Sequence, residues 1–137
     1  HGPSSWSFVF QNFLNSMPES ERVVLIDMIG FGKSDKPKRE KFHQLHQHRL
    51  ILRDFVDRLG LKSINVVLEG WHSGLLMSLC EGISPLICNF LVLPEGRSRL
   101  SVAAFDDAMQ APFPDKGYKA GVREFSRLLL ELKREKI

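Results

Sequence analysis

The sequence predicts an α/β fold in which crossover helices cover a small parallel sheet. Three apolar stretches, at 23–28, 64–68 and 89–93, have the length and composition of buried strands, and the first begins with a β-branched run. Segments with apolar residues at helical spacing separate these stretches. Because helix and strand alternate, consecutive strands would be joined by crossovers, which favours a parallel sheet. No strand is expected after residue 93, so the predicted sheet is small.

The first predicted helix follows the opening residues, and Ser4 or Ser5 can cap it. Its apolar face consists of Trp6, Val9, Phe10, Phe13 and Leu14. The run at residues 23–26 then predicts a buried strand, which Asp27 and two turn-forming glycines end. The loop at 33–37 is polar.

The middle of the chain predicts a helix, a strand, a second helix and a third strand. Between residues 43 and 59, one helical face carries Leu45, Leu52, Phe55, Val56 and Leu59. Gly60 can supply a left-handed cap for this helix. The strand at 64–68 follows. A helix bearing Leu75, Leu76 and Leu79 is expected to end near Gly82, before the strand at 89–93.

The character of the chain changes after Pro94. A polar turn, a short helix at about 102–109 and a proline-rich stretch at 111–115 precede a final helix. The final helix has an apolar stripe of Val122, Phe125, Leu128, Leu129 and Leu132. Arg127 and Glu131 are spaced to pair on its solvent side.

Composition excludes several classes of protein. Hydrophobic residues make up 43% and charged residues 26% of 137, which is typical of a globular protein and not of a disordered chain, collagen or a coiled coil. A net charge of +3 is too small to predict a nucleic-acid or membrane partner. The apolar runs are too short to span a bilayer and no signal peptide is recognised, so we expect a cytoplasmic protein. Cys80 and Cys88 lie in apolar stretches and are predicted to be reduced packing residues.

The stretch VVLEGWHSGLL at residues 66–76 predicts a strand, a tight turn and a helix. Such a corner presents the attacking residue in α/β hydrolases and needs small neighbours. If Gly70 and Gly74 are the small flanking residues, His72 occupies the apex. That position holds neither Asp, Ser nor Cys.

Three stretches together resemble the haloalkane dehalogenase branch of the α/β-hydrolase superfamily. HGPSSW at 1–6 is similar to the oxyanion loop of that family, and GFGKSDKP at 30–37 is the most diagnostic motif. APFPD at 111–115 with YKAGVREF at 118–125 is similar to a segment of the cap domain. The resemblance implies a partial α/β-hydrolase core at 1–94 and a truncated, helical, cap-like segment at 95–137.

The resemblance also implies a chemistry. The family hydrolyses carbon–halogen bonds in small halogenated or similar apolar substrates and needs no cofactor. A carboxylate at the corner displaces halide to give an ester, and a water activated by histidine cleaves that ester. Backbone N–H groups stabilise the oxyanion that forms in the second step.

The corner departs from this pattern at the nucleophile. Aligning Trp71 with the halide-binding tryptophan of the family places Gly70, which has no side chain, at the nucleophile position. His72, Glu69 and Ser73 are the alternative candidates. A shift of one residue along a strand reverses the side-chain direction, so Glu69 is expected to point away from the apex. Trp71 could equally be a buried aromatic residue without a role in binding.

Two further departures affect the rest of the catalytic machinery. In the loop formed by His1, Gly2 and Pro3, the third residue should donate its backbone N–H, but proline has none. No residue matches the catalytic histidine of the family. We therefore expect this chain to be inactive alone. The alternative is a non-catalytic protein: a pseudoenzyme, a gene remnant or an interaction module.

Other polar residues are assigned structural roles. His43, His46 and His48 form a cluster in which His43 and His46 would share a helix face. A solvated face is the favoured interpretation, because a zinc site would need a further ligand that the neighbouring sequence does not offer, and no metal is expected. By resemblance, Asp27 is a structural carboxylate beside the GFGKSDKP turn.

The resemblance has a consequence for the sheet. In the superfamily, the strand that leads into His-Gly lies between the strands expected at 23–28 and 64–68, and this sequence has no such strand. The two strands must pair directly or leave open edges, which favour association. We expect marginal stability or self-association.

Overall fold

The computed structural model describes residues 1–70, 73–94 and 102–135. Within these residues there are four 3₁₀ helices, η1 to η4, five α-helices and two strands. In chain order these elements are η1 (Ser7–Phe10), α1 (Gln11–Leu14), η2 (Glu40–Phe42), α2 (Leu45–Arg58), β1 (Ile64–Glu69), α3 (Ser73–Leu79), η3 (Cys80–Leu86), β2 (Ile87–Leu93), α4 (Val102–Gln110), η4 (Lys116–Lys119) and α5 (Ala120–Glu135).

The sheet of the described residues has two strands, β1 and β2, which run parallel. Asn65 lies beside Asn89 and Glu69 beside Leu93, with an irregularity at the start that leaves Cys88 without a counterpart. The expected crossover is present, because α3 and η3 connect the two strands. Cys80 is buried, as expected, and burial raises the pKa of its thiol to about 11. Cys88 is exposed, so its prediction as a packing residue was wrong.

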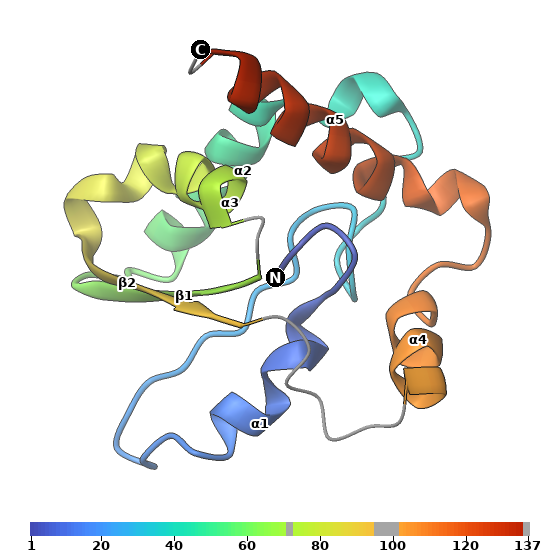
Figure 1. Cartoon of the computed structure of the whole chain (residues 1–137). Helices are drawn as coiled ribbons and strands as arrows, with labels where there is room; N and C mark the ends of the chain where they lie inside the picture. Colours follow the sequence, from blue (N-terminus) through green and yellow to red (C-terminus); the bar gives the residue numbers. More distant parts are fainter. Residues whose placement is uncertain (71–72, 95–101, 136–137) are drawn as a thin grey trace.

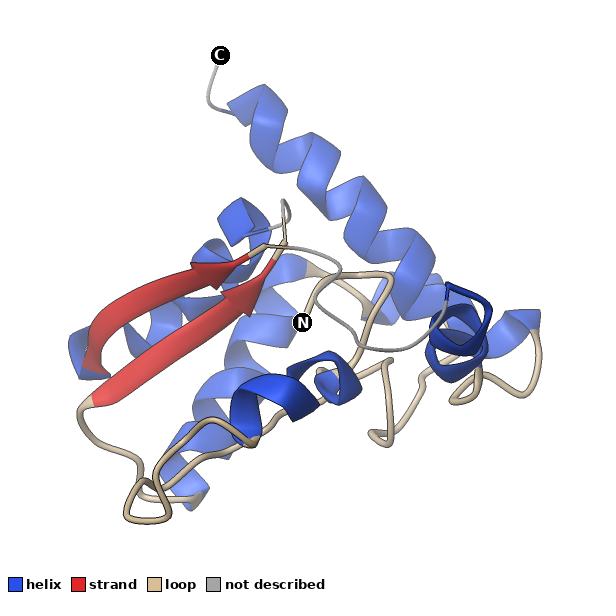
Figure 2. Ribbon diagram, turned by 60° about the horizontal axis from the view of Figure 1, so that its bottom comes forward, coloured by secondary structure: helices blue, strands red, loops and turns tan. Residues whose placement is uncertain are grey.

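The helices lie on both sides of the strands (Figures 1 and 2). Figure 1 shows α2, α3 and α5 on one side and α1 on the other. One hydrophobic core joins the helices to the strands, and its buried members are Met28, Phe31, Leu52, Val56, Leu68, Leu75, Leu76, Leu79, Cys80, Ile83, Phe125, Leu128 and Leu129. The apolar stripe predicted for the last helix therefore packs into this core.

The segment at 23–26 is not a strand, so this prediction was wrong. Its backbone is extended, but no backbone hydrogen bond joins these four residues to any other described segment. Val24 and Leu25 remain 38% and 39% exposed. A run of β-branched residues favours an extended chain, whereas a strand also requires a neighbour with which to pair. The strand predicted at 64–68 pairs instead with β2, on the side away from residues 23–26.

Local sequence signals correctly predicted two features of the helices and failed for a third. α2 ends at Arg58, and Gly60 adopts the left-handed conformation expected of a cap, with φ of 60°. α5 carries the predicted ion pair between Arg127 and Glu131. The capping prediction for the first helix was wrong. Trp6 is the N-cap residue of η1 and makes no side-chain capping bond, while the Ser5 hydroxyl group bonds elsewhere.

The described helices include none that combines the length and the apolar character needed to cross a bilayer.

Candidate functional site

The strand–turn–helix corner is present at the carboxyl end of β1. Gly70 has a φ of 76°, a backbone conformation that glycine adopts without steric cost. Its N–H donates to the Leu93 carbonyl at 2.9 Å, and its own carbonyl accepts from the Ser73 N–H at 3.3 Å. The chain thus turns between the end of β1 and the start of α3, beside the end of β2. This confirms the corner predicted from residues 66–76.

The candidates at this corner have different positions. Gly70 lies in the turn and offers only its backbone. Ser73 is half-buried as the first residue of α3. Trp71, the candidate halide-binding residue, and His72, the alternative apex residue, lie outside the described residues.

Glu69 is buried at the end of β1 and faces the N-terminal loop. It is 8% exposed, and its Oε2 atom accepts a hydrogen bond of 2.7 Å from the Ser5 hydroxyl group. Its carboxylate also interacts electrostatically with the α-amino group of His1. The hydrogen bond offsets part of the cost of burying this polar group. Its role in the structure is to hold the loop at residues 1–5 against β1.

His1 connects the same loop to the extended segment before the GFGKSDKP turn. The backbone N–H of Met28 donates to Nε2 of His1 at 3.0 Å, and Nδ1 lies 2.9 Å from the Gly2 carbonyl. This arrangement requires the neutral tautomer with its proton on Nδ1. Burial lowers the pKa of the α-amino group, and the charges of Glu69 and Asp27 partly oppose that change. Figures 1 and 2 place this end of the chain beside the carboxyl ends of the strands.

The loop compared with an oxyanion loop is a tight turn. The Gly2 carbonyl accepts from both the N–H and the hydroxyl group of Ser5, at 3.2 and 3.3 Å. Pro3 occupies the interior of this turn and has no N–H to donate. The turn therefore provides one donor fewer than the family pattern requires.

Asp27 acts as a structural carboxylate. Its Oδ1 accepts from the Ser7 N–H and its Oδ2 from the Lys33 N–H, both at 2.8 Å. Gly32 packs so closely that a Cβ atom there would lie 2.2 Å from Asp27 Cγ. The carboxylate thus organises the GFGKSDKP loop and connects it to η1.

His43 and His48 form a buried pair, so the prediction of a solvated histidine face was wrong for both. Each is fully buried, whereas His46 is exposed. Nδ1 of His43 lies 3.3 Å from Nε2 of His48, and the rings stack 5.4 Å apart. The predicted pairing of His43 with His46 on one helix face was also wrong, because α2 begins at Leu45 and His43 precedes it.

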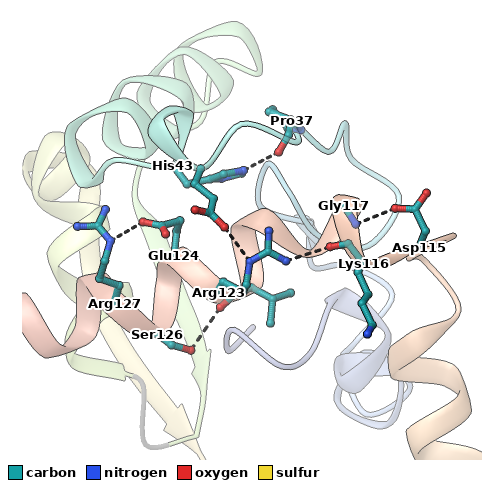
Figure 3. A network of polar contacts seen from close by, with 11 residues as sticks. Pro37, His43, Asp115, Lys116, Gly117, Arg123, Glu124, Ser126 and Arg127 are labelled. Carbon is teal, nitrogen blue, oxygen red and sulfur yellow. Dashed lines mark hydrogen bonds and ion pairs between the residues drawn. The ribbon is translucent and has the colours of Figure 1, made fainter.

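The Pro37 carbonyl fixes the protonation of this pair (Figure 3). It accepts from Nε2 of His43 at 2.9 Å, so Nδ1 of His43 is the acceptor for the N–H of His48. Nδ1 of His48 then has no partner among the described residues. Burial, and secondly the proximity of His43, lower the pKa of His48 to about 4. The His48 ring is therefore neutral at pH 7.

The segments that contain the GFGKSDKP and YKAGVREF motifs lie side by side. Arg123 donates to Glu40 and to the Lys116 carbonyl, both at 2.9 Å, and so joins α5 and η4 to η2 (Figure 3). The Lys38 ammonium group lies 4.0 Å from the ring centre of Tyr118, within the range of a cation–π contact. Gly121 packs closely on the GFGKSDKP motif, because a Cβ atom added there would lie 3.3 Å from the Gly30 Cα atom. GFGKSDKP at 30–37 and YKAGVREF at 118–125 therefore pack against each other.

Sequence reasoning did not identify two of these contacts. The Ser5–Glu69 hydrogen bond joins residues 64 positions apart. The only local signal for it was an acidic residue at the end of an apolar strand. The His43–His48 pair had no periodic signal, because its members belong to different elements. Among the described residues, no group of three or more His, Cys, Asp or Glu side chains could hold a metal ion.

Comparisons with known proteins agree with these observations. A family model described as alpha/beta hydrolase fold matches residues 1–68. Haloalkane dehalogenase 1 of Mycobacterium bovis is 27% identical over 164 residues, which cover 94% of this chain and 55% of that protein. The haloalkane dehalogenase of Psychrobacter cryohalolentis is 24% identical and 54% covered. The chain spans about half the length of the curated relatives it matches.

A solved structure extends the similarity to the fold. The haloalkane dehalogenase DpaA from Paraglaciecola agarilytica NO2, described as tetrameric, superimposes with a TM-score of 0.73 at 24% identity. The match covers 93% of this chain and 54% of that protein.

Proposed function

We propose that this partial α/β hydrolase, a distant homologue of the haloalkane dehalogenases, does not cleave carbon–halogen bonds by itself. The observation that carries the proposal is Gly70 in the turn of the corner, where the resemblance requires a carboxylate. Without that side chain, no alkyl–enzyme ester can form at this position. The chain is a haloalkane dehalogenase-like fragment whose active-site corner lacks a nucleophile.

The neighbouring side chains support inactivity. Glu69 precedes Gly70 in the chain, but it is buried and already accepts a hydrogen bond from the Ser5 hydroxyl group. As a nucleophile it would have to leave this partner, and a buried polar group without a partner is costly. Pro3 removes one oxyanion donor, and loss of one such donor lowers turnover by about 10²- to 10³-fold in enzymes that use one.

A halide-release assay tests the proposal. The chain is incubated with a short bromoalkane, and bromide is measured against a buffer control. We expect release at the buffer rate for the wild type, because the nucleophile and the activating histidine are both missing. A Gly70→Asp variant should remain inactive as well, since it restores the nucleophile without the histidine.

If bromide release exceeds the buffer rate, two matched tryptophan variants show whether it comes from the corner. Trp71 resembles the halide-binding tryptophan, whereas the Trp6 Nε1–H donates to the Ala108 carbonyl at 3.0 Å in the structure. Bromide release that Trp71→Phe abolishes and Trp6→Phe retains would show a working site and overturn the proposal. In that case the substrate would be a small halogenated or similar apolar compound, turned over without a cofactor.

A second candidate function is that of an interaction module. The exposed apolar side chains of β2 favour it, because contiguous apolar surface on a folded chain marks sites of association.

A further inference from the structure

β2 is an unprotected apolar edge strand. Its sequence, ICNFLVL, contains no charged residue, no proline and no glycine. Phe90, Leu91 and Val92 are 39%, 49% and 47% exposed, and because they are consecutive, both faces of the strand are partly exposed. Natural edge strands usually carry charges, prolines or a covering element that prevents pairing with another chain. The described part of this chain gives β2 none of these protections.

The direction of the backbone shows which groups this edge presents. The Leu93 carbonyl accepts from the Gly70 N–H, so the polar backbone groups of Leu93 face β1. The register is regular from Asn89 onward, and successive residues of a strand direct these groups to alternate sides. The N–H and C=O groups of Phe90 and Val92 therefore face away from β1. They have no hydrogen-bond partner within the described residues.

We propose that a second copy of this chain pairs with this edge, β2 against β2, antiparallel about a two-fold axis at Leu91. In this register Phe90 lies opposite Val92 of the second copy, so that all four outward N–H and C=O groups of each strand find partners. Centring the axis on Phe90 would use Cys88, which lies at the irregularity. Centring it on Val92 would oppose Phe90 to Pro94, which has no N–H.

Charge also favours a second copy over an unrelated strand. A two-fold contact brings the same patch of both copies together, so a charge on it would face a like charge nearby. An uncharged strand pairs with itself without this repulsion. The exposed parts of three side chains form a small surface, so the contact falls below about 1,200 Å² and monomer and dimer should exchange. The inference is independent of whether the chain has catalytic activity.

Cysteine cross-linking tests the register. In a Cys88→Ser background, Leu91→Cys places two cysteines directly opposite each other, with Cα atoms about 4.5 Å apart. This separation is within the range of a disulfide. Under mild oxidation by oxidised glutathione, we expect a covalent dimer on a non-reducing gel. Cys80 is buried and is not expected to react.

Asn89→Cys is the matched control on the same face of the same strand. In the proposed register, residue 89 lies opposite Leu93 of the second copy. The two introduced cysteines are therefore four residues apart along the strand direction, roughly 13 Å, which is too far for a disulfide. We expect Leu91→Cys to cross-link at least tenfold faster than Asn89→Cys. Equal rates, a faster control or no dimer would overturn the register. A ladder of higher species would also contradict it, because a two-fold contact closes on itself.

Sedimentation of the unmodified chain provides a second measurement that requires no cysteine variant. The weight-average mass should rise with concentration toward that of a dimer, and Leu91→Lys should abolish the rise by placing two ammonium groups at the axis. Leu91 is half exposed, so the substitution leaves the core intact. A wild type that stays monomeric, or a variant that associates equally well, would refute the proposal.

Discussion

At the residue scale, the His43–His48 pair shows how one backbone carbonyl determines the protonation of two side chains. The Pro37 carbonyl selects the tautomer of His43, and His43 in turn selects that of His48. A further proton would have to reside on Nδ1 of His48, which is buried and has no hydrogen-bond partner in the described part of the chain. The ring lies between His43 and Phe125, and neither offers a compensating charge.

The stability of the fold should therefore decrease in mild acid. The pKa of His48 is lowered in the folded state from 6.5 to about 4, so the unfolded chain binds the proton more readily. The stabilisation is fully present above pH 6.5, and it is lost as the pH falls from 6.5 toward 4. A shift of this size corresponds to about 3 kcal/mol. Urea unfolding at pH 7 and at pH 5 measures the expected decrease.

Two variants separate this effect from other titrations. His48→Gln keeps an N–H donor for His43 but cannot titrate, so its unfolding free energy should depend less on pH. His46→Gln removes an exposed histidine and should behave as the wild type. The α-amino group of His1 contributes equally to all three proteins. If His48→Gln and His46→Gln show the same pH dependence, the assignment to His48 is wrong.

At the element scale, the segments that were predicted correctly are those with a local cause. Apolar residues at helical spacing and a glycine at the end identified α2, and the stripe on α5 identified its buried face. The segment at 23–26 was predicted wrongly because pairing depends on a distant neighbour. The histidine pair was missed for a similar reason. His43 precedes α2, so the spacing of a helix face does not apply to it.

α5 provides a test of the buried stripe. Phe125 is fully buried, with its ring centre 4.7 Å from those of Phe31 and His48. Phe125→Ala should lower the unfolding free energy by about 3–5 kcal/mol, because it removes a packed ring and leaves a cavity. Leu130 on the same helix is 57% exposed, so Leu130→Ala should change it by less than about 0.5 kcal/mol. Equal effects in chemical denaturation would mean that α5 does not pack as described.

At the scale of the whole molecule, one core supports a sheet of only two described strands. The extended segment at 23–26 lies beside this core without pairing, and β2 has an exposed outer edge. Three apolar side chains of β2 therefore stay partly exposed, and the part of their surface that faces water adds nothing to the stability of the fold. The sequence motifs identified the type of fold, whereas the open outer edge of β2 follows from the order of the sheet, in which β1 is the only paired neighbour of β2 among the described residues.

Thermal unfolding tests the marginal stability expected from this arrangement. We expect a midpoint below about 50 °C at low protein concentration, near the lower end of the usual range for mesophilic domains. Because association stabilises the folded state, the midpoint should rise with concentration. Circular dichroism at several concentrations measures both. A monomer with a cooperative transition above about 50 °C would contradict the expectation.

The contact between Phe31 and Phe125 has a consequence for the order of folding. The two rings belong to residues far apart in the sequence, and their centres lie 4.7 Å apart in the core. Contacts between distant parts of a chain require closure of a long loop, so they form later than local ones. We expect the helix–strand unit from α2 to β2 to assemble through contacts between residues near in sequence. We expect α5 to dock later, because its Phe125 packs on Phe31, which lies in the loop at 30–37. Until α5 docks, the apolar faces of α2 and α3 remain open to solvent and to neighbouring chains.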